Sequence, residues 1–395
     1  MIFKKFFNKD SALVEEYAKE FNVLPSTMYL ILSRGFSTKQ EIEDYLSTGN
    51  LLDPFLIRNM KELCERIHLA KQMGDKVLIF GDYDVDGITS TALLYDTIKS
   101  LGGNVNYYIP DRKDEGYGIN IMAVNRLIKS GVKLLITVDC GITAVGEVEF
   151  SKLQGMDVII TDHHTCKERI PEAAVAVINP KRPDDEYEFD GLAGVGVAFK
   201  VSMGVAMAMG KSAGDFFEKY VDLAAIGTIA DVVPLVNENR VIVDRGLQVL
   251  QDPARPGLRA LLEIAGMSDK KVTCATVAFG LAPRLNAAGR MGSATTAVEL
   301  LLTDDTGRAM QIAQELDAVN KTRQETEYEI HRDALDMIEN DKDFDKKKVV
   351  VLAKEGWHNG VIGIVASRIT EIYHRPCILI SLTDGVGKGS GRSVQ

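Results

Sequence analysis

Three short apolar runs, each followed at once by acidic or histidine residues, constrain the fold of this chain more than any other feature. The runs and the residues that follow them are KVLIFGDYDVDGIT with Asp82, Asp84 and Asp86, LLITVDCGIT with Asp139, and DVIITDHHT with Asp162, His163 and His164. Stretches long enough for a helix separate the runs, which is typical of parallel strands in βαβ units. Because ligands lie outside the carboxyl ends of the strands in open α/β sheets, we expect all three clusters at one edge of one sheet.

These clusters predict a site for divalent cations. Three aspartates spaced two apart repel one another, and a bound cation compensates that repulsion best. Carboxylates together with imidazole, without a cysteine pair at zinc-finger spacing, favour manganese or magnesium over structural zinc. The number of ligands is compatible with two ions about 3.5–4 Å apart, which activate a water and stabilise the leaving oxygen in phosphoester hydrolysis. Asp231, a lone carboxylate in the apolar stretch AAIGTIADVVPL, is the candidate for a further ligand because burying an isolated charge is costly.

Each cluster also has an ordinary structural interpretation. Asp139 could be the N-cap of a helix that begins near Thr143. The two histidines could be a simple loop pair, and Asp231 could cap a turn before Pro234. The occurrence of three clusters at equivalent strand ends favours the metal site over these separate explanations.

Two other metal or phosphate motifs resemble DYDVDG but are incomplete. An EF-hand loop that begins at Asp82 requires a bidentate Glu at its twelfth position, where this chain has Leu93. The nucleophile motif DxDx[TV] of haloacid-dehalogenase-type phosphatases does not fit either, because Ile88 stands four residues after Asp84. Neither a calcium-binding protein nor that phosphatase class is favoured.

Seven motifs, in order, resemble those of one known family. GDYDVDG, VDCG, TDHH and ADVVPL look like the four motifs of the DHH phosphoesterases. PRLNAAGRMG (283–292), GWHNGVIGIVASRI (356–369) and GKGSGRS (387–393) resemble the motifs of one branch, the RecJ single-strand-specific exonucleases. The resemblance extends from about residue 50 to the last residue.

The resemblance implies roles for individual residues. The implied metal ligands are Asp84, Asp86, Asp139, His163 and Asp231. The implied catalytic groups are His164, Asp139 and Asp82. His164 would hold the scissile phosphate or assist the leaving group. For Asp82, and also for Asp162, a hydrogen bond to a metal ligand is expected. The implied substrate contacts are Arg284, Arg290, His358, Arg368, Lys388 and Arg392. Many family members have a histidine four residues before the first metal aspartate, and this chain has Phe80 there.

The resemblance also implies an activity and partners. We expect a metal-dependent, single-stranded-DNA-specific exonuclease that works from the 5′ end and releases mononucleotides in DNA repair and recombination. Expected partners are single-stranded DNA, a single-strand-binding protein and a helicase. The alternatives are a DHH phosphodiesterase acting on short oligonucleotides, cyclic dinucleotides or pyrophosphate, and a non-catalytic replication scaffold, which should have lost metal ligands.

Composition agrees with an intracellular globular enzyme. The 395 residues are enough for two or three domains, and the hydrophobic share of 46% argues against extended disorder. No apolar run is long enough for a membrane span, and five irregularly spaced cysteines suit a reducing cytoplasm. The net charge of −10 is unusual for a nucleic-acid enzyme and favours a narrow basic channel over a broad basic face.

We predict an α/β fold in which a parallel-sheet DHH domain is joined by a long helix to a second, smaller α/β domain. The predicted parts are a helical segment at 1–50, the catalytic domain at 51–303, the connecting helix at 304–343, and the start of a DHHA1-type substrate-binding domain at 344–395. Residues 191–210 are expected to form a helix packed closely on the sheet. PRLNAAGRMG is expected to be a loop, and KGSGRS a Gly-rich phosphate-binding loop. RecJ proteins carry more of the last domain and then an OB-fold, so we expect that domain to be incomplete here.

Overall fold

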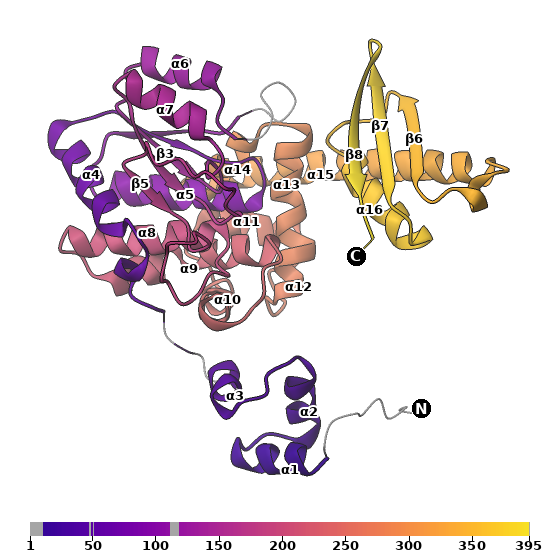
Figure 1. Cartoon of the computed structure of the whole chain (residues 1–395), viewed down its shortest axis with the longest axis horizontal. Coiled ribbons are helices and arrows are strands. Elements are labelled where there is room, and N and C mark those ends of the chain that lie inside the picture. Colours follow the sequence, from indigo (N-terminus) through magenta and orange to yellow (C-terminus); the bar gives the residue numbers. More distant parts are fainter. Residues whose placement is uncertain (1–10, 47–48, 50, 111–117, 395) are drawn as a thin grey trace.

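The computed structural model describes residues 11–46, 49, 51–110 and 118–394. Its N-terminal helices form a separate group beside the main body of the molecule (Figure 1), which they contact where Arg240 lies 4.5 Å from the ring centre of Tyr45. They are α1 (Ser11–Glu20), α2 (Pro25–Ser33) and α3 (Lys39–Leu46), and they pack around a small core of their own that includes Met28, Leu32 and Ile42. The described part of the 1–50 segment is therefore helical, as predicted, whereas residues 1–10, 47–48 and 50 lie outside the described residues.

The main body is built on a five-stranded parallel sheet, so the predicted α/β fold is confirmed. The strand order is β2-β1-β3-β4-β5, and every neighbouring pair is parallel. The strands are β1 (Val77–Phe80), β2 (Val105–Tyr108), β3 (Leu134–Val138), β4 (Asp157–Thr161) and β5 (Ala176–Ile178). The three apolar runs of the sequence form β1, β3 and β4, which are adjacent in the sheet. Their carboxyl ends therefore share one edge, as expected.

Helices cover both faces of this sheet, which explains why the strands have apolar residues at every position. Ile79, Ile136 and Ile159 point to one face, and Leu78 and Ile160 to the other. The first face is covered by η1 (Pro54–Leu56), α4 (Met60–Met73), α5 (Val85–Ser100), α8 (Gly194–Ala208), α9 (Ala213–Ala230) and α10 (Asn237–Val249). The second is covered by α6 (Ile121–Lys129) and α7 (Val145–Leu153) (Figure 1).

The Gly- and Ala-rich run at 191–210 forms helix α8, as predicted. Its residues are buried from Gly194 to Ala206, because the small side chains let the helix pack closely between α5 and α9 next to the sheet. Within the described ranges, the structure contains no helix with the length and apolarity needed to cross a bilayer.

The region after α10 is helical, but the prediction of a loop for PRLNAAGRMG is wrong. This motif forms helix α13 (Ala282–Met291), which continues a short π-helical segment, Val277–Leu281. Pro283 lies in the first turn, where a missing N–H costs no hydrogen bond, so the proline does not interrupt the helix. The neighbouring helices are α11 (Pro256–Ile264), α12 (Cys274–Thr276) and α14 (Ala294–Leu302).

Helix α13 packs directly on the turn that follows β1. A Cβ atom added at Gly289 would lie 2.0 Å from the carbonyl oxygen of Tyr83, so only glycine permits this approach. Asn286 fixes the same contact, because its Oδ1 accepts a hydrogen bond from Val85 N at 3.2 Å. The helix is thus held against the residues between Asp82 and Asp86.

A 34-residue helix, α15 (Thr306–Glu339), leads to a second sheet. This sheet contains β6 (Val350–Glu355), β7 (Cys377–Thr383) and β8 (Val386–Arg392) in the order β6-β7-β8, and α16 (Ile362–Tyr373) packs on it. The short helix η3 (Phe344–Lys346) precedes β6. The expected long helix and the second, smaller α/β part are therefore present.

The expected loop at KGSGRS is a strand instead. These residues lie in β8, which pairs antiparallel with β7 so that Lys388 is opposite Ser381. The reason is the connection between the two strands: Asp384 and Gly385 both have positive φ, 50° and 77°, as a two-residue type I′ hairpin turn requires. The Asp-Gly pair in the sequence was the signal for this hairpin.

The second sheet is attached to α13 as well as to α15. Met291 packs into the apolar cluster that contains Ile330 and Trp357. Arg290 Nη1 donates a hydrogen bond to the Gly360 carbonyl at 3.3 Å, and a Cβ atom at Gly360 would lie 2.3 Å from the Arg290 carbonyl oxygen. One helix therefore contacts both the metal-site turn and the second sheet.

We predict that Gly289→Ala lowers the thermal midpoint and the free energy of unfolding, by about 1–3 kcal/mol, because the added methyl group overpacks the contact with Tyr83. Thermal and urea unfolding measure this loss. The matched control is Gly146→Ala in α7, where an added Cβ would meet no described atom within 4 Å and helix propensity should improve stability slightly. Equal stability of the two variants would contradict the proposed packing of α13.

Candidate metal centre

The local structure after β1 and β3 brings the acidic side chains close together. Asp84 is the N-cap of α5 and accepts a hydrogen bond from Gly87 N at 3.1 Å, so Asp86 lies in the first helical turn. Asp139 follows β3 with a φ of 59°, and Thr137 Oγ1 steadies the turn by donating to the Cys140 carbonyl at 2.7 Å. Asp139 is not a helix cap, because α7 begins only at Val145.

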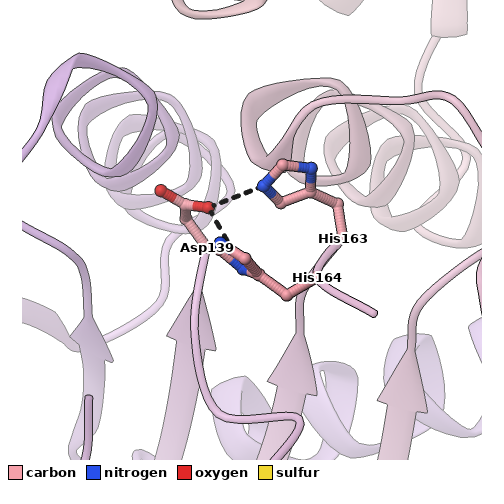
Figure 2. A group of neighbouring side chains, drawn as sticks. All are labelled: Asp139, His163 and His164. Carbon is pink, nitrogen blue, oxygen red and sulfur yellow. Dashed lines mark ion pairs between the residues drawn. The ribbon is translucent and has the colours of Figure 1, made fainter. Parts of the chain in front are cut away.

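His163 lies at the centre of the cluster. Its Nε2 is 3.1 Å from Asp139 Oδ1 and 3.7 Å from Asp86 Oδ2, and its Nδ1 is 3.8 Å from Asp231 Oδ2. Figure 2 shows Asp139 facing both histidines. Three overlapping groups have their ligand atoms within 4.8 Å of one another, namely Asp139 with His163 and His164, Asp86 with His163 and Asp231, and Asp82 with Asp84 and Asp139.

The N-terminus of α8 holds Asp86 in place. Gly194 N and Val195 N donate to the two carboxylate oxygens of Asp86 at 2.7 and 2.6 Å, where the positive end of the helix favours a negative charge. Gly194 is also required sterically, because a Cβ atom there would lie 2.8 Å from Asp139 Cβ. A helix that the sequence suggested only for packing therefore positions two of the predicted ligands.

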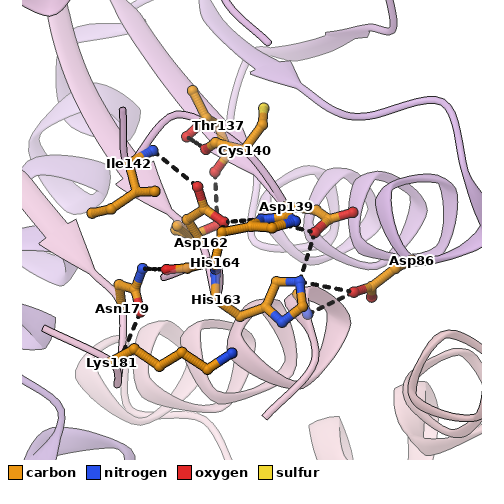
Figure 3. Close-up of polar contacts among 12 residues, drawn as sticks. Asp86, Thr137, Asp139, Cys140, Ile142, Asp162, His163, His164, Asn179 and Lys181 are labelled. Atoms are coloured by element: carbon orange, nitrogen blue, oxygen red, sulfur yellow. Dashed lines mark hydrogen bonds and ion pairs between the residues drawn. The ribbon is translucent and has the colours of Figure 1, made fainter. Parts of the chain in front are cut away.

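Asp162 orients the histidine pair rather than facing the centre of the cluster. It accepts hydrogen bonds from Ile142 N, from the backbone N–H groups of both histidines, and from His164 Nδ1 at 2.7 Å (Figure 3). This hydrogen bond raises the pKa of His164, in spite of partial burial. Burial alone would raise the pKa of Asp162, but the hydrogen bonds from His164 and the backbone outweigh it and lower that pKa.

Three carboxyl groups of the cluster, those of Asp86, Asp139 and Asp231, have raised pKa values. Burial, followed by the charge of Asp84, raises the pKa of Asp86 to about 7. Burial and the charge of Asp86 raise the pKa of Asp231 to about 6, and the same two causes raise that of Asp139 well above its ordinary value. Burial lowers the pKa of His163, which favours the neutral imidazole that a metal ligand requires.

The donor set fits divalent cations that prefer oxygen and imidazole ligands. The contacts of 3.1 to 3.8 Å around His163 are close to the spacing of about 3 Å between neighbouring ligands of an octahedral ion with bonds of about 2.1 Å. His163 Nδ1 is buried and has no hydrogen-bond partner among the described residues. Bound cations would also compensate the carboxylate repulsion that raises the pKa values.

The structure also shows the surroundings of Asp82 and Phe80. Asp82 is buried next to Asp84 and Asp139, at the edge of the cluster. Phe80, at the position where many family members have a histidine, is fully buried, and its ring packs against Tyr108 with the centroids 5.7 Å apart. This side of the cluster is therefore apolar in this chain.

A cavity of about 150 Å³ adjoins the cluster, with room for several water molecules. Its polar lining consists of Asp84, Asp86, Asp231, Asn286 and Arg290. Of the six predicted substrate contacts, Arg290 is the one that lines this cavity.

The other predicted substrate contacts do not line this cavity. Arg284 pairs with Asp317 of α15 at 2.8 Å, and Arg368 pairs with the buried Glu327 of α15 at 2.6 Å. Arg392 Nε donates to Ser367 Oγ, His358 Nδ1 accepts from Gly360 N, and Lys388 is exposed on β8. Sequence reasoning could not foresee the arginine pairs, because both carboxylate partners lie on α15, more than thirty residues away in the chain.

Sequence reasoning missed three polar residues that contribute to the site. Asn286 binds the turn after β1, as described above. Asn179 and Lys181 follow β5, and Asn179 Nδ2 donates to the His164 carbonyl at 2.9 Å. The signal was present, because the run AVAVI before Asn179 is a further apolar strand with polar residues at its carboxyl end.

Comparison with known proteins gives consistent matches. The DHH family, N-terminal domain, matches residues 76–228. The single-stranded-DNA-specific exonuclease RecJ of Bacillus subtilis (strain 168) is 41% identical over 390 residues, which cover 98% of this chain and 48% of that protein. The chain therefore spans about half the length of this curated relative.

Solved structures resemble the chain as well. A crystal structure of exonuclease RecJ bound to manganese is 36% identical with a TM-score of 0.78, covering 87% of this chain and 84% of that one. A structure of RecJ in complex with Mn²⁺ from Thermus thermophilus is 34% identical with a TM-score of 0.82, covering 98% of this chain and 54% of that one.

The raised pKa of Asp231 predicts a pH-dependent stability in the absence of metal. A carboxyl group whose pKa is higher in the folded protein than in the unfolded chain loses stabilisation as it ionises, here between its ordinary value of 3.8 and about 6. In EDTA, the thermal midpoint of Asp231→Asn should therefore rise relative to that of the unaltered chain as the pH increases from about 4 to about 7. With manganese added, Asp231→Asn should have the lower thermal midpoint of the two proteins, because the variant lacks a proposed metal ligand.

Differential scanning fluorimetry over this pH range measures both effects. Asp269→Asn, which changes an exposed aspartate outside the cluster, is the matched control and should follow the unaltered chain. Parallel pH curves for Asp231→Asn and the unaltered chain in EDTA would contradict the electrostatic account of the cluster.

Proposed function

We propose, because the chain belongs to the RecJ branch of the DHH phosphoesterase family, that it hydrolyses single-stranded DNA from the 5′ end and releases mononucleotides with the help of divalent cations. The observation that carries this proposal is the set of three overlapping ligand groups around Asp139 and His163 at the carboxyl edge of the sheet. A non-catalytic scaffold would not need to retain these ligands.

The proposed ligands of two Mn²⁺ or Mg²⁺ ions are Asp84, Asp86, Asp139, His163 and Asp231. Relatives of this chain have been solved with Mn²⁺ and with Mg²⁺, which supports oxygen-preferring ions here. When bound, such ions supply Lewis acidity that activates water and neutralises charge on a phosphodiester. Asp82, buried beside Asp84 and Asp139, would help to fix the position of these ligands.

His164 is the proposed proton donor to the departing sugar oxygen. The hydrogen bond from its Nδ1 to Asp162 fixes the orientation of the ring, leaves Nε2 for the substrate and raises its pKa, so the protonated form is more populated near neutral pH. About half of the His164 side chain is exposed, in contrast to the buried His163. His163 is thus suited to a metal and His164 to the reacting phosphodiester.

Arg290 is the proposed contact to the phosphate that enters the cavity, because it lines the space next to Asp84 and Asp86. His358, Lys388 and Arg392 remain proposed substrate contacts of the second sheet. Arg284 and Arg368 would contact DNA only if phosphate replaced Asp317 or Glu327 as their partner. A narrow basic path, rather than a broad basic face, agrees with the net charge of −10.

The proposed setting is DNA repair and recombination in the cytoplasm, with single-stranded DNA as substrate and with a single-strand-binding protein and a helicase as candidate partners. Five free cysteines are consistent with a reducing compartment. Within the chain, we assign catalysis to residues 51–303, the connection to 304–343 and substrate binding to 344–395. The helical segment at 1–50 has no assigned role.

A DHH phosphodiesterase specific for short oligonucleotides or cyclic dinucleotides is the alternative that shares this metal centre. The two activities are separated by substrate length and not by the ligands, so the assay must offer both kinds of substrate.

We expect the chain to release mononucleotides from the 5′ end of a single strand in manganese, and to lose this activity in EDTA. Strands labelled at either end, duplexes, dinucleotides and a cyclic dinucleotide, each analysed over time, measure direction and substrate length. Asp139→Ala should be inactive, because it removes a residue shared by two of the ligand groups. Cleavage restricted to dinucleotides or cyclic dinucleotides would favour the alternative.

The His164→Ala variant should lower kcat by about 10²-fold or more while leaving manganese binding nearly unchanged, because His164 is assigned to proton transfer. Single-turnover cleavage and calorimetric titration with manganese measure the two quantities. The control is His68→Ala, which changes a histidine of α4 away from the cluster. Normal cleavage by His164→Ala would overturn the assignment, and so would a loss of cleavage that is accompanied by a loss of manganese binding.

A further inference from the structure

The row of functional residues along the sheet edge continues past the histidines. Strands β4 and β5 are parallel neighbours, and Thr161 pairs with Ile178. Lys181 therefore stands three residues after the end of β5, just as His164 stands three residues after the end of β4. Equivalent positions after adjacent parallel strands lie side by side at the sheet edge.

The backbone of Lys181 is tied to the histidine loop. Asn179 Oδ1 accepts a hydrogen bond from Lys181 N at 2.9 Å, while Asn179 Nδ2 donates to the His164 carbonyl at 2.9 Å. Figure 3 shows the Lys181 side chain extending past these contacts, with its ammonium group toward His163.

The ammonium group of Lys181 has no structural task in the fold. Among the described residues it forms no ion pair and no side-chain hydrogen bond, although the side chain is half-buried. The neighbouring cation behaves in the opposite way: Arg182 is buried and bonds to Asn59 Oδ1, the Val177 carbonyl and Asp184, each at 2.8 Å. One of two adjacent cations therefore stabilises the loop, and the other points into the site.

We propose that the ammonium group of Lys181 binds a phosphate of the single strand adjacent to the phosphate held at the metal centre, an inference that rests on the proposed function. A cation beside a site for divalent ions is repelled by them unless an anion lies between. Arg290 lies next to Asp84, a residue that follows β1, whereas Lys181 follows β5. The two cations therefore lie at opposite ends of the row of neighbouring β-strands β1-β3-β4-β5. A DNA single strand that crosses the metal centre along this row would meet a positive charge on each side.

The competing role for Lys181 is a counter-charge that offsets the carboxylates before metal binds. The two roles differ in what a neutral substitution changes. Loss of a phosphate contact lowers the affinity for the DNA single strand and makes that affinity less dependent on salt. Loss of a counter-charge tightens manganese binding and leaves the affinity for the DNA single strand unchanged.

The test compares Lys181→Gln with Lys133→Gln. Lys133 precedes β3, at the opposite edge of the sheet, and its exposed side chain carries the same charge, so it is a matched control. Binding of a labelled phosphorothioate single strand, which resists cleavage, is measured by fluorescence anisotropy in manganese over a series of salt concentrations. Manganese affinity is measured by calorimetry on the same variants.

For Lys181→Gln we expect strand affinity to fall roughly tenfold at low salt. The slope of log affinity against log salt should become shallower by about 0.7, as for one lost phosphate contact to a single strand. Lys181→Arg should retain most of the affinity, and Lys133→Gln should match the unaltered chain. Manganese affinity should be unchanged in Lys181→Arg and Lys133→Gln. In Lys181→Gln it should not fall, because removal of a cation does not weaken the binding of a nearby divalent cation, so a loss of strand affinity cannot be due to lost metal.

Two results would overturn the inference, and they are distinguishable. If the unaltered chain binds the strand and Lys181→Gln shows the same affinity and slope, Lys181 does not contact phosphate and the proposed function stands. If the unaltered chain binds manganese but no strand, the proposed function fails and the inference fails with it.

Discussion

The crowding of buried carboxylates around His163 is the constraint on which the rest of the structure depends. Asp86 and Asp139 are almost fully buried, and ionised groups in such a place must be compensated. The fold supplies part of that compensation with the N-terminus of α8, whose amides bind Asp86. Bound cations would supply the remainder, so the stability of this edge of the sheet and its chemistry have the same origin.

Helix α13 links this edge to the second sheet. Asn286 and Gly289 contact the turn that carries the first aspartates, and Arg290, on the same helix, contacts Gly360 in the turn between β6 and α16. Glycine is needed on both sides, because Tyr83 and Arg290 present backbone carbonyls at distances that exclude a side chain. The residues of the motif PRLNAAGRMG therefore serve the packing of the protein as well as supplying arginines.

Two of the predicted substrate contacts are paired with carboxylates within the fold. Helix α15 pairs its carboxylates with Arg284 and Arg368, so these arginines hold the domains together in this structure. Arg290 lies beside the metal centre on one side, and Lys181 lies beside it on the other. An acidic protein can therefore present positive charge where a phosphate chain would pass, without a broad basic surface.

Local patterns in the chain were enough to predict the sheet, the convergence of Asp84, Asp139 and His163, and the family. The reason is local, since apolar runs of strand length followed by ligands fix both the strand and the edge at which its ligands lie. Only the tertiary structure decided that PRLNAAGRMG is a helix, that KGSGRS is a strand, and which arginines pair with carboxylates. Those outcomes depend on partners distant in the chain, such as Tyr83 for Gly289 and Glu327 for Arg368, and no local pattern encodes which distant group a side chain will meet.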